Sequence, residues 1–161
     1  KLWNLPVLYV IENNKYGMGT STKRHAAGEL YKRGEGYDIP GEQVDGQDVF
    51  EVRKAARQAL DYVRSGNGPY ILEILTYRYR GHSMSDPAKY RSKEEVSRVR
   101  SESDPIDLLR EKIAAAKAAT EDELRELDKK VKGIVTSAAD YAQQSPEPDP
   151  SELYTDLLVE A

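Results

Sequence analysis

The sequence contains no cysteine and only two histidines among its 161 residues. A disulfide framework, a thiolate metal site and a cysteine nucleophile are therefore excluded. No apolar run approaches the ~20 residues that a membrane helix needs, and the first residues lack the charged-then-apolar pattern of a signal peptide. The net charge of −4, without any basic stripe, argues against a nucleic-acid surface. We therefore expect a water-soluble protein that binds neither membrane nor nucleic acid.

The first half of the chain alternates between strand-like and helix-like segments. Apolar runs typical of strands occupy residues 6–12 and 70–77, and a shorter one lies at residues 42–44. Apolar side chains recur at helical spacing over residues 48–64. This strand, helix and strand have the length of a right-handed crossover, so the sequence predicts an α/β fold with a parallel sheet. The loop after the first strand is expected to become helical near residues 25–33.

The second half is predicted to be helical. Thr120 and Glu123 form a capping-box sequence at the start of a long amphipathic segment. A proline-rich linker over residues 143–150 follows that segment. The remaining predicted helices cover residues 92–100, 105–119 and 151–159.

The loop that follows the first strand is rich in groups that bind cations. Residues 12–21 contain the pair Asn13 and Asn14, with Gly17 and Gly19 beyond them. In open α/β sheets, ligands bind where parallel strands end. Carboxamide oxygens and glycine-relieved backbone carbonyls are the hard ligands that Mg²⁺ on a phosphorylated cofactor prefers. Taken alone, however, these residues are also typical of an ordinary turn at the end of a strand.

A second motif follows the second long strand. Residues 76–87 contain two arginines, a glycine and His82. Together with residues 12–21, this segment resembles the alpha subunits of the thiamine-diphosphate-dependent pyruvate dehydrogenase component. The similarity extends through residues 39–46 to the tail at residues 146–150 and so covers essentially the whole chain. Two specific motifs in the same order make a chance match improbable.

The resemblance implies a thiamine-diphosphate-binding fold that is truncated at its amino terminus. In the family, a Gly-Asp-Gly motif upstream of the Asn-containing loop also holds magnesium and diphosphate, and the sequence begins after that point. We therefore expect the carboxyl-terminal part of an alpha subunit. Residues 1–91 would complete the α/β cofactor-binding domain, and residues 92–161 would form a helical extension of the same domain.

The same resemblance implies the site residues. The side-chain oxygen of Asn14 and the backbone carbonyl of Tyr16 would be magnesium ligands and would hold the cofactor together with His82. His82 would also be the catalytic histidine that helps to pass the two-carbon unit to a lipoyl group, although a lone loop histidine is commonly an exposed bystander. Asn13 is the weaker ligand candidate, because neighbouring side chains on an extended segment point to opposite faces.

The sequence also suggests roles for a pair of arginines and a pair of serines. Arg78 and Arg80 alternate on a strand exit and should therefore lie on one side, where they could pair with diphosphate, with substrate or, in a purely structural role, with Asp86. Ser83 and Ser21 match positions that are phosphorylated in regulated family members. A phosphate there would repel the cofactor or disorder the loop.

The implied activity is the oxidative decarboxylation of pyruvate with acetyl transfer to a lipoyl group, using thiamine diphosphate and Mg²⁺. The implied partners are a beta subunit, in an α2β2 heterotetramer, and the lipoyl domain and core of the acyltransferase component. The piece alone should be inactive. Acetoin-cleaving or branched-chain 2-oxo acid relatives, and a non-catalytic assembly module, remain alternatives. A bacterial cytoplasmic location is expected, with the mitochondrial matrix as the alternative.

Overall fold

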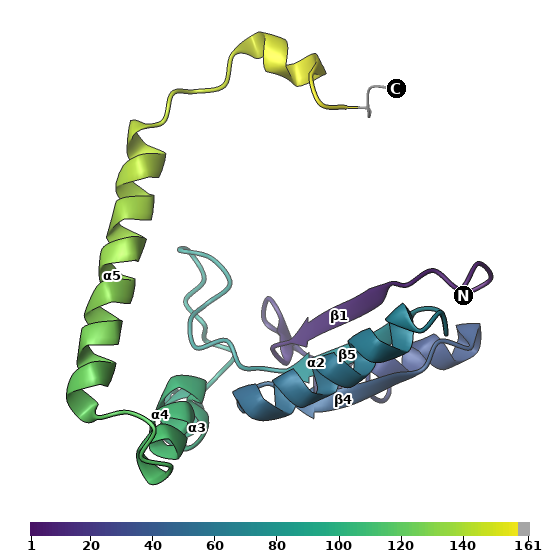
Figure 1. Ribbon diagram of the computed structural model, residues 1–161, viewed down its shortest axis with the longest axis horizontal. Coiled ribbons are helices and arrows are strands. Elements are labelled where there is room, and N and C mark those ends of the chain that lie inside the picture. Colours follow the sequence, from purple (N-terminus) through teal and green to yellow (C-terminus); the bar gives the residue numbers. More distant parts are fainter. Residues whose placement is uncertain (158–161) are drawn as a thin grey trace. The chain divides into compact units, whose positions relative to one another are not determined.

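The computed structural model describes residues 1–157 and divides the chain into two compact units (Figure 1). The first unit, Lys1–Ile113, contains all of the strands of the described residues, and the second begins at Ala114. The division that the sequence suggests, after residue 91, stays a prediction.

Three parallel strands form the sheet of the first unit. They are β1 (Leu8–Asn13), β4 (Gly41–Asp45) and β5 (Tyr70–Leu75), in the order β1-β5-β4. Because all three strands run in the same direction, Asn13, Asp45 and Leu75 lie at one edge of the sheet, paired across neighbouring strands. The predicted α/β class with a parallel sheet is confirmed.

Helix α2 (Val49–Arg64) makes the crossover from β4 to β5 and packs on the sheet (Figure 1). The side chain of Asp48 caps its start by accepting the N–H of Phe50 at 3.0 Å. The buried residues Ala55, Ala59 and Val63 recur every four positions, so one stripe of small side chains lets the helix approach the sheet closely. The predicted helix is confirmed.

The segment between β1 and β4 contacts strands β4 and β5 through its 3-10 helix. It contains the short hairpin β2 (Tyr16–Gly17) and β3 (Thr20–Ser21), a single turn α1 (Thr22–His25) and the 3-10 helix η1 (Tyr31–Tyr37).

The helical segment expected near residues 25–33 is present only at the two ends of that range, because α1 ends at His25 and η1 begins at Tyr31. The backbone becomes extended at Ala26 and takes a positive φ of 82° at Gly28, and both conformations end a helix.

Helices α3 (Lys93–Ser103) and α4 (Pro105–Ala115) follow β5, as predicted. The hydroxyl of Ser92 caps α3 by accepting the N–H of Glu95 at 3.0 Å. The helix predicted to reach residue 119 ends earlier, and Lys117 adopts a left-handed conformation with φ of 51°.

The second unit consists of α5 (Glu121–Gln144) and the 3-10 helix η2 (Pro150–Tyr154). The predicted capping box is confirmed: the Thr120 N–H donates to Glu123 at 2.7 Å, and the Thr120 hydroxyl accepts the Glu123 N–H at 3.3 Å. The last predicted helix is shorter than expected, and its residues 158–159 lie outside the described residues. Across residues 1–157, the structure contains no helix with the length and apolar character needed to span a membrane.

Two glycines of η1 provide a matched test of its packing. A Cβ at Gly34 would lie 2.5 Å from the Ile39 carbonyl oxygen and 2.7 Å from Ile71 Cδ1, whereas a Cβ at Gly36 would meet nothing within 4 Å. We expect Gly34→Ala to lower the free energy of unfolding by about 1–3 kcal/mol through overpacking. Gly36→Ala should change it by less than about 0.5 kcal/mol. Chemical denaturation of both variants measures the difference, and equal midpoints would contradict this packing.

Candidate functional site

Two loops meet beyond the carboxyl ends of the strands: the Asn loop (residues 13–21) and the His loop (residues 81–90). Arg78, which follows β5, joins them. Its Nη2 donates to the Met18 carbonyl at 2.9 Å and to the Tyr90 hydroxyl at 3.1 Å. The rings of Tyr16 and Tyr90 also lie 5.5 Å apart, centre to centre, at a tilt of 40°. The structure therefore brings together the two motifs that the sequence singles out.

The side chain of Asn13 forms hydrogen bonds within the protein. Its amide nitrogen donates to Glu73 Oε1 at 2.6 Å, and its oxygen accepts the N–H of Lys15 at 2.9 Å. A cation would have to compete with that backbone N–H for the oxygen. The geometry supports a structural role for Asn13, as its position on the strand suggests.

Glu73 is a wholly buried carboxylate in the central strand β5, with 0% of its surface exposed. Its Oε2 accepts the backbone N–H groups of Leu30 and Tyr31 at 3.0 and 3.1 Å. Burial alone would raise the pKa of Glu73, but hydrogen bonds, led by the one from Asn13, hold that pKa below its ordinary value. The sequence signal for this residue is a charge inside an otherwise apolar strand.

Asn14 and Tyr16 present oxygens that a cation could use. The Asn14 side-chain oxygen accepts only a long bond in the described residues, from the Tyr16 N–H at 3.2 Å, and a carboxamide oxygen has two lone pairs. The Lys15 carbonyl accepts the Thr22 N–H at 2.9 Å, which makes those two residues a hydrogen-bonded pair of the hairpin. In antiparallel strands, hydrogen-bonded pairs of residues alternate with non-hydrogen-bonded pairs. The next pair, Tyr16 and Ser21, is therefore a non-hydrogen-bonded pair, and its carbonyls do not bond across the hairpin.

This donor set fits a hard cation, but it is incomplete. Two neutral oxygens leave most of an octahedral shell to other groups. Within residues 1–157, no three His, Asp or Glu side chains gather closely enough to hold a metal by themselves. The described residues would therefore supply only part of a magnesium site.

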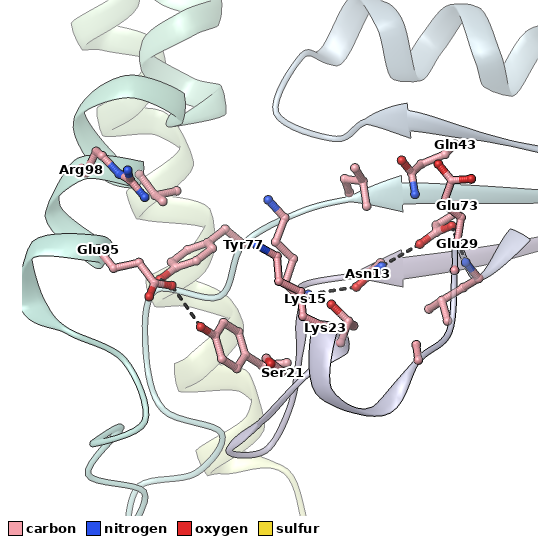
Figure 2. Close-up of a pocket in the computed structure, with 17 residues that line it drawn as sticks. Asn13, Lys15, Ser21, Lys23, Glu29, Gln43, Glu73, Tyr77, Glu95 and Arg98 are labelled. Atoms are coloured by element: carbon pink, nitrogen blue, oxygen red, sulfur yellow. Dashed lines mark hydrogen bonds between the residues drawn. The ribbon is translucent and has the colours of Figure 1, made fainter.

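A cavity of about 680 Å³ lies beside the Asn loop (Figure 2). Asn13 and Glu73 stand on one wall, and Tyr77, Glu95 and Arg98 stand on the opposite wall. Asn14 does not line the cavity, which agrees with the opposite orientation of neighbouring side chains on an extended segment. The cavity is lined by equal numbers of positively and negatively charged residues, which are Lys15, Lys23, Arg98, Glu29, Glu73 and Glu95.

The His loop is organised around Asp86. The carboxylate accepts the N–H of His82 at 2.7 Å, the N–H of Ala88 at 2.8 Å and the hydroxyl of Tyr90 at 2.7 Å. These donors, led by His82, hold the pKa of Asp86 at about 2. A side chain at Gly81 would place its Cβ 2.5 Å from the Asp86 carbonyl oxygen, so the turn needs glycine there. The loop therefore has its own internal framework.

His82 is exposed, and its ring lies beside Arg78. Its Nδ1 is 3.3 Å from Arg78 Nη1. A guanidinium can only donate, so Nδ1 accepts and the proton of the neutral ring sits on Nε2. This arrangement leaves Nε2 as a donor toward an anion, in keeping with the role that the sequence suggests.

Arg78 and Arg80 do not act together. The side chain of Arg78 joins the two loops, whereas that of Arg80 is exposed. The Arg80 carbonyl accepts a hydrogen bond from Arg91 Nη2 at 2.8 Å. The strand alternation that suggested a common side does not apply, because β5 ends at Leu75, before either arginine. The proposed pairing of Arg78 with Asp86 runs through the Tyr90 hydroxyl, which both contact.

Arg91 is a second residue that we did not foresee. Only 8% of its surface is exposed, and its guanidinium donates to the carbonyls of Arg78, Tyr79 and Arg80. It also lies 5.3–5.4 Å from the ring centres of three tyrosines, one from each segment that meets here. These are Tyr16, Tyr77 and Tyr90.

The two candidate phosphorylation sites differ in exposure. Ser83 is exposed in the His loop, with its Oγ 3.1 Å from that of Ser85. Ser21 is half-buried at the start of α1 and lines the cavity. A modifying enzyme would therefore reach Ser83 more readily, and phosphorylation of either residue stays a prediction.

Comparison with known proteins gives the family. A family model described as the dehydrogenase E1 component matches residues 1–151. The chain belongs to the dehydrogenase E1 component family. This assignment confirms the resemblance from the two motifs.

Several relatives of this E1 family member carry the same description, pyruvate dehydrogenase E1 component subunit alpha. The protein from Rhizobium meliloti is 58% identical over 98% of this chain and 46% of its own length. That from Zymomonas mobilis is 54% identical over 98% of this chain and 45% of its length. The human somatic, mitochondrial form is 50% identical over 94% of this chain and 39% of its length. The chain thus spans about half the length of the curated relatives it matches.

The pKa of Asp86 yields a prediction for the His loop. Because its folded pKa of about 2 lies below the ordinary 3.8, the bonds to this carboxylate should persist above about pH 4 and be lost as the pH falls toward 2. In a nuclear magnetic resonance titration, the amide protons of His82 and Ala88 should shift together with a midpoint near 2. Asp86→Asn should remove that titration. A shared midpoint near 3.8, with the protein still folded by circular dichroism, would refute the proposed hydrogen bonding.

Proposed function

We propose that this chain forms part of the alpha subunit of a thiamine-diphosphate-dependent pyruvate dehydrogenase, which decarboxylates pyruvate and transfers the acetyl unit to a lipoyl group. The main support is the bridge made by Arg78, which bonds both the Asn loop and the His loop at the carboxyl edge of a parallel sheet. That edge is where such sheets bind phosphorylated ligands. The descriptions of the relatives support the same function.

In this proposal, the Asn14 side-chain oxygen and the Tyr16 carbonyl would hold Mg²⁺, which would supply positive charge beside the cofactor diphosphate. The other positions of its octahedral shell would be filled by other groups. Bound thiamine diphosphate supplies an electron sink for decarboxylation. The residues present here fix the charged end of the cofactor, while Asn13 and Glu73 support the loop behind them.

His82 acts at the mouth of the site. Its Nε2 proton can be donated to a diphosphate oxygen or moved during transfer of the acetyl unit. Arg78, bonded to Nδ1, keeps the proton on Nε2 and lowers the cost of placing negative charge nearby. Arg78 is therefore a positioning residue for His82.

The proposed partners are a beta subunit, in an α2β2 heterotetramer, and the lipoyl domain and core of an acyltransferase component. Exposed apolar side chains support such contacts: Tyr9 and Val10 are 52% and 53% exposed on opposite faces of β1, and Met84 in the His loop is fully exposed. We propose a bacterial cytoplasmic location, consistent with the higher identity to the Rhizobium meliloti and Zymomonas mobilis proteins than to the human mitochondrial one.

Substitution of the metal ligand tests the function. In the full-length subunit assembled with its beta partner, Asn14→Ala should weaken Mg²⁺-dependent binding of thiamine diphosphate by at least about tenfold, because a direct ligand is lost. Calorimetric titration of the cofactor measures this. Asn13→Ala is the matched control and should have a milder effect, since its side chain holds Glu73 rather than the cation. Unchanged cofactor binding in Asn14→Ala would contradict the assignment.

A charge at Ser83 tests the role of the His loop. Ser83→Glu adds negative charge beside His82 and should reduce acetyl transfer to a lipoyl domain more than it reduces binding of thiamine diphosphate. Ser85→Ala, which removes only the neighbouring hydroxyl, should leave both nearly unchanged. Equal transfer rates for Ser83→Glu and the unmodified enzyme would exclude this site as a point of control.

A further inference from the structure

Glu95, in the first turn of α3, connects that helix to the Asn loop. A single oxygen of its carboxylate, Oε1, accepts the hydroxyl of Tyr16 at 3.1 Å and the hydroxyl of Tyr77 at 2.8 Å. Glu95 lies 79 residues from Tyr16 in the sequence. The contact therefore depends on the tertiary fold.

The position of Glu95 is itself fixed. Its backbone N–H donates to the cap hydroxyl of Ser92 at 3.0 Å, and a carboxylate in the first turn of a helix is favoured by the helix dipole. The side chain is half-buried and lines the cavity opposite Asn13 and Glu73 (Figure 2). A carboxylate whose own position is fixed in this way can hold the side chains that donate to it in place.

Tyr16 is held at its far end and along its ring. Glu95 accepts its hydroxyl, the Tyr90 ring lies 5.5 Å away, and the Arg91 guanidinium lies 5.4 Å from its ring centre. A tyrosine side chain has only two rotatable bonds before its rigid ring. Fixing the hydroxyl and the ring therefore restricts the Cα and the adjacent peptide group, including the carbonyl that the hairpin leaves unpaired.

We propose that Glu95 is a positioning residue for the cation site: by anchoring the Tyr16 hydroxyl, it fixes the direction of the Tyr16 carbonyl and of Asn14 beside it. This inference rests on the proposed function. Glu73 anchors Asn13 on the other side of the two oxygens, so a carboxylate secures the loop at each end of the ligand segment. Groups that orient metal ligands typically change metal affinity about 10–100-fold when they are removed.

The test uses the full-length subunit assembled with its beta partner and measures the dissociation constant of Mg²⁺ by calorimetry at saturating thiamine diphosphate. Glu95→Ala should raise this constant about tenfold. Glu95→Gln should stay within about threefold of the unmodified enzyme, because a carboxamide oxygen can also accept both hydroxyls. Glu102→Ala, which removes an exposed charge from the same helix α3, is the matched control and should have no effect.

A double-mutant cycle identifies the route of the effect. Tyr16→Phe should weaken Mg²⁺ binding to a similar extent, and combining it with Glu95→Ala should add little, because both remove the same bond. Tyr77→Phe should leave Mg²⁺ binding nearly unchanged. Additive effects of the Glu95 and Tyr16 substitutions, or an unchanged constant in Glu95→Ala, would overturn the inference. If Glu95→Ala does not fold, Tyr16→Phe decides alone: unchanged Mg²⁺ binding in it also overturns the inference.

Failure of this inference is distinct from failure of the proposed function. Weaker binding in Asn14→Ala with normal binding in Glu95→Ala would leave the cation site intact and reject only the role of Glu95. Normal binding in both variants would reject the cation site itself. Thermal unfolding without cofactor separates a general loss of stability from a loss of positioning. Tyr77→Phe removes one bond to the same carboxylate and should lower the melting temperature without weakening Mg²⁺ binding, whereas Tyr16→Phe should weaken Mg²⁺ binding.

Discussion

The buried carboxylate of Glu73 is the interaction on which the site depends. A charge in a central strand is costly unless it is fully hydrogen-bonded, and here donors from the Asn loop and from the segment around η1 meet it. One donor is Asn13, at the start of the Asn loop, and others are backbone N–H groups at the start of η1. The need to satisfy one carboxylate therefore fixes where the Asn loop leaves the sheet and where the following segment returns to it.

The rest of the site is built from tyrosines and arginines rather than from apolar packing. Tyr16, Tyr77 and Tyr90 surround Arg91, and their hydroxyls are accepted by Glu95 and Asp86. Aromatic rings give such loops buried area with few rotatable bonds, while each hydroxyl fixes a direction. Such a network specifies geometry more sharply than aliphatic contacts would, which suits the proposed role of presenting oxygens to a cation.

The sequence predicts the parts of the structure that have local causes. Strand β5, helix α2 and the capping box at Thr120 each follow from a pattern within a few residues, and the parallel sheet follows from their order. The ends of the helices and strands are less well predicted. The helix expected near residues 25–33 is broken at Ala26 and Gly28, where the tertiary contacts of the segment override the weak propensity of a short polar stretch.

The candidate ligands could be predicted because motif residues are contiguous, but their supports could not. Glu73 and Asn13 are 60 residues apart, and Glu95 and Tyr16 are 79 residues apart. Nothing in a local pattern distinguishes Glu95 from Glu94 beside it; only the register of α3 against the Asn loop does so. A charge within a buried strand, as at Glu73, is the one such signal that sequence inspection could have used.

In the proposed function, the contacts of Glu73 and Glu95 with the Asn loop also reduce the free energy needed to order that loop when a cofactor binds. Ordering a flexible loop around a ligand takes free energy from binding, and a loop that is already held does not incur that cost. The Asn loop is held at Asn13 by Glu73 and at Tyr16 by Glu95, and Arg78 joins it to the His loop. Glu73, Glu95 and Arg78 all lie outside the Asn loop. The geometry of the proposed cation site is therefore a property of the folded unit, Lys1–Ile113, and the motif residues alone would not have it.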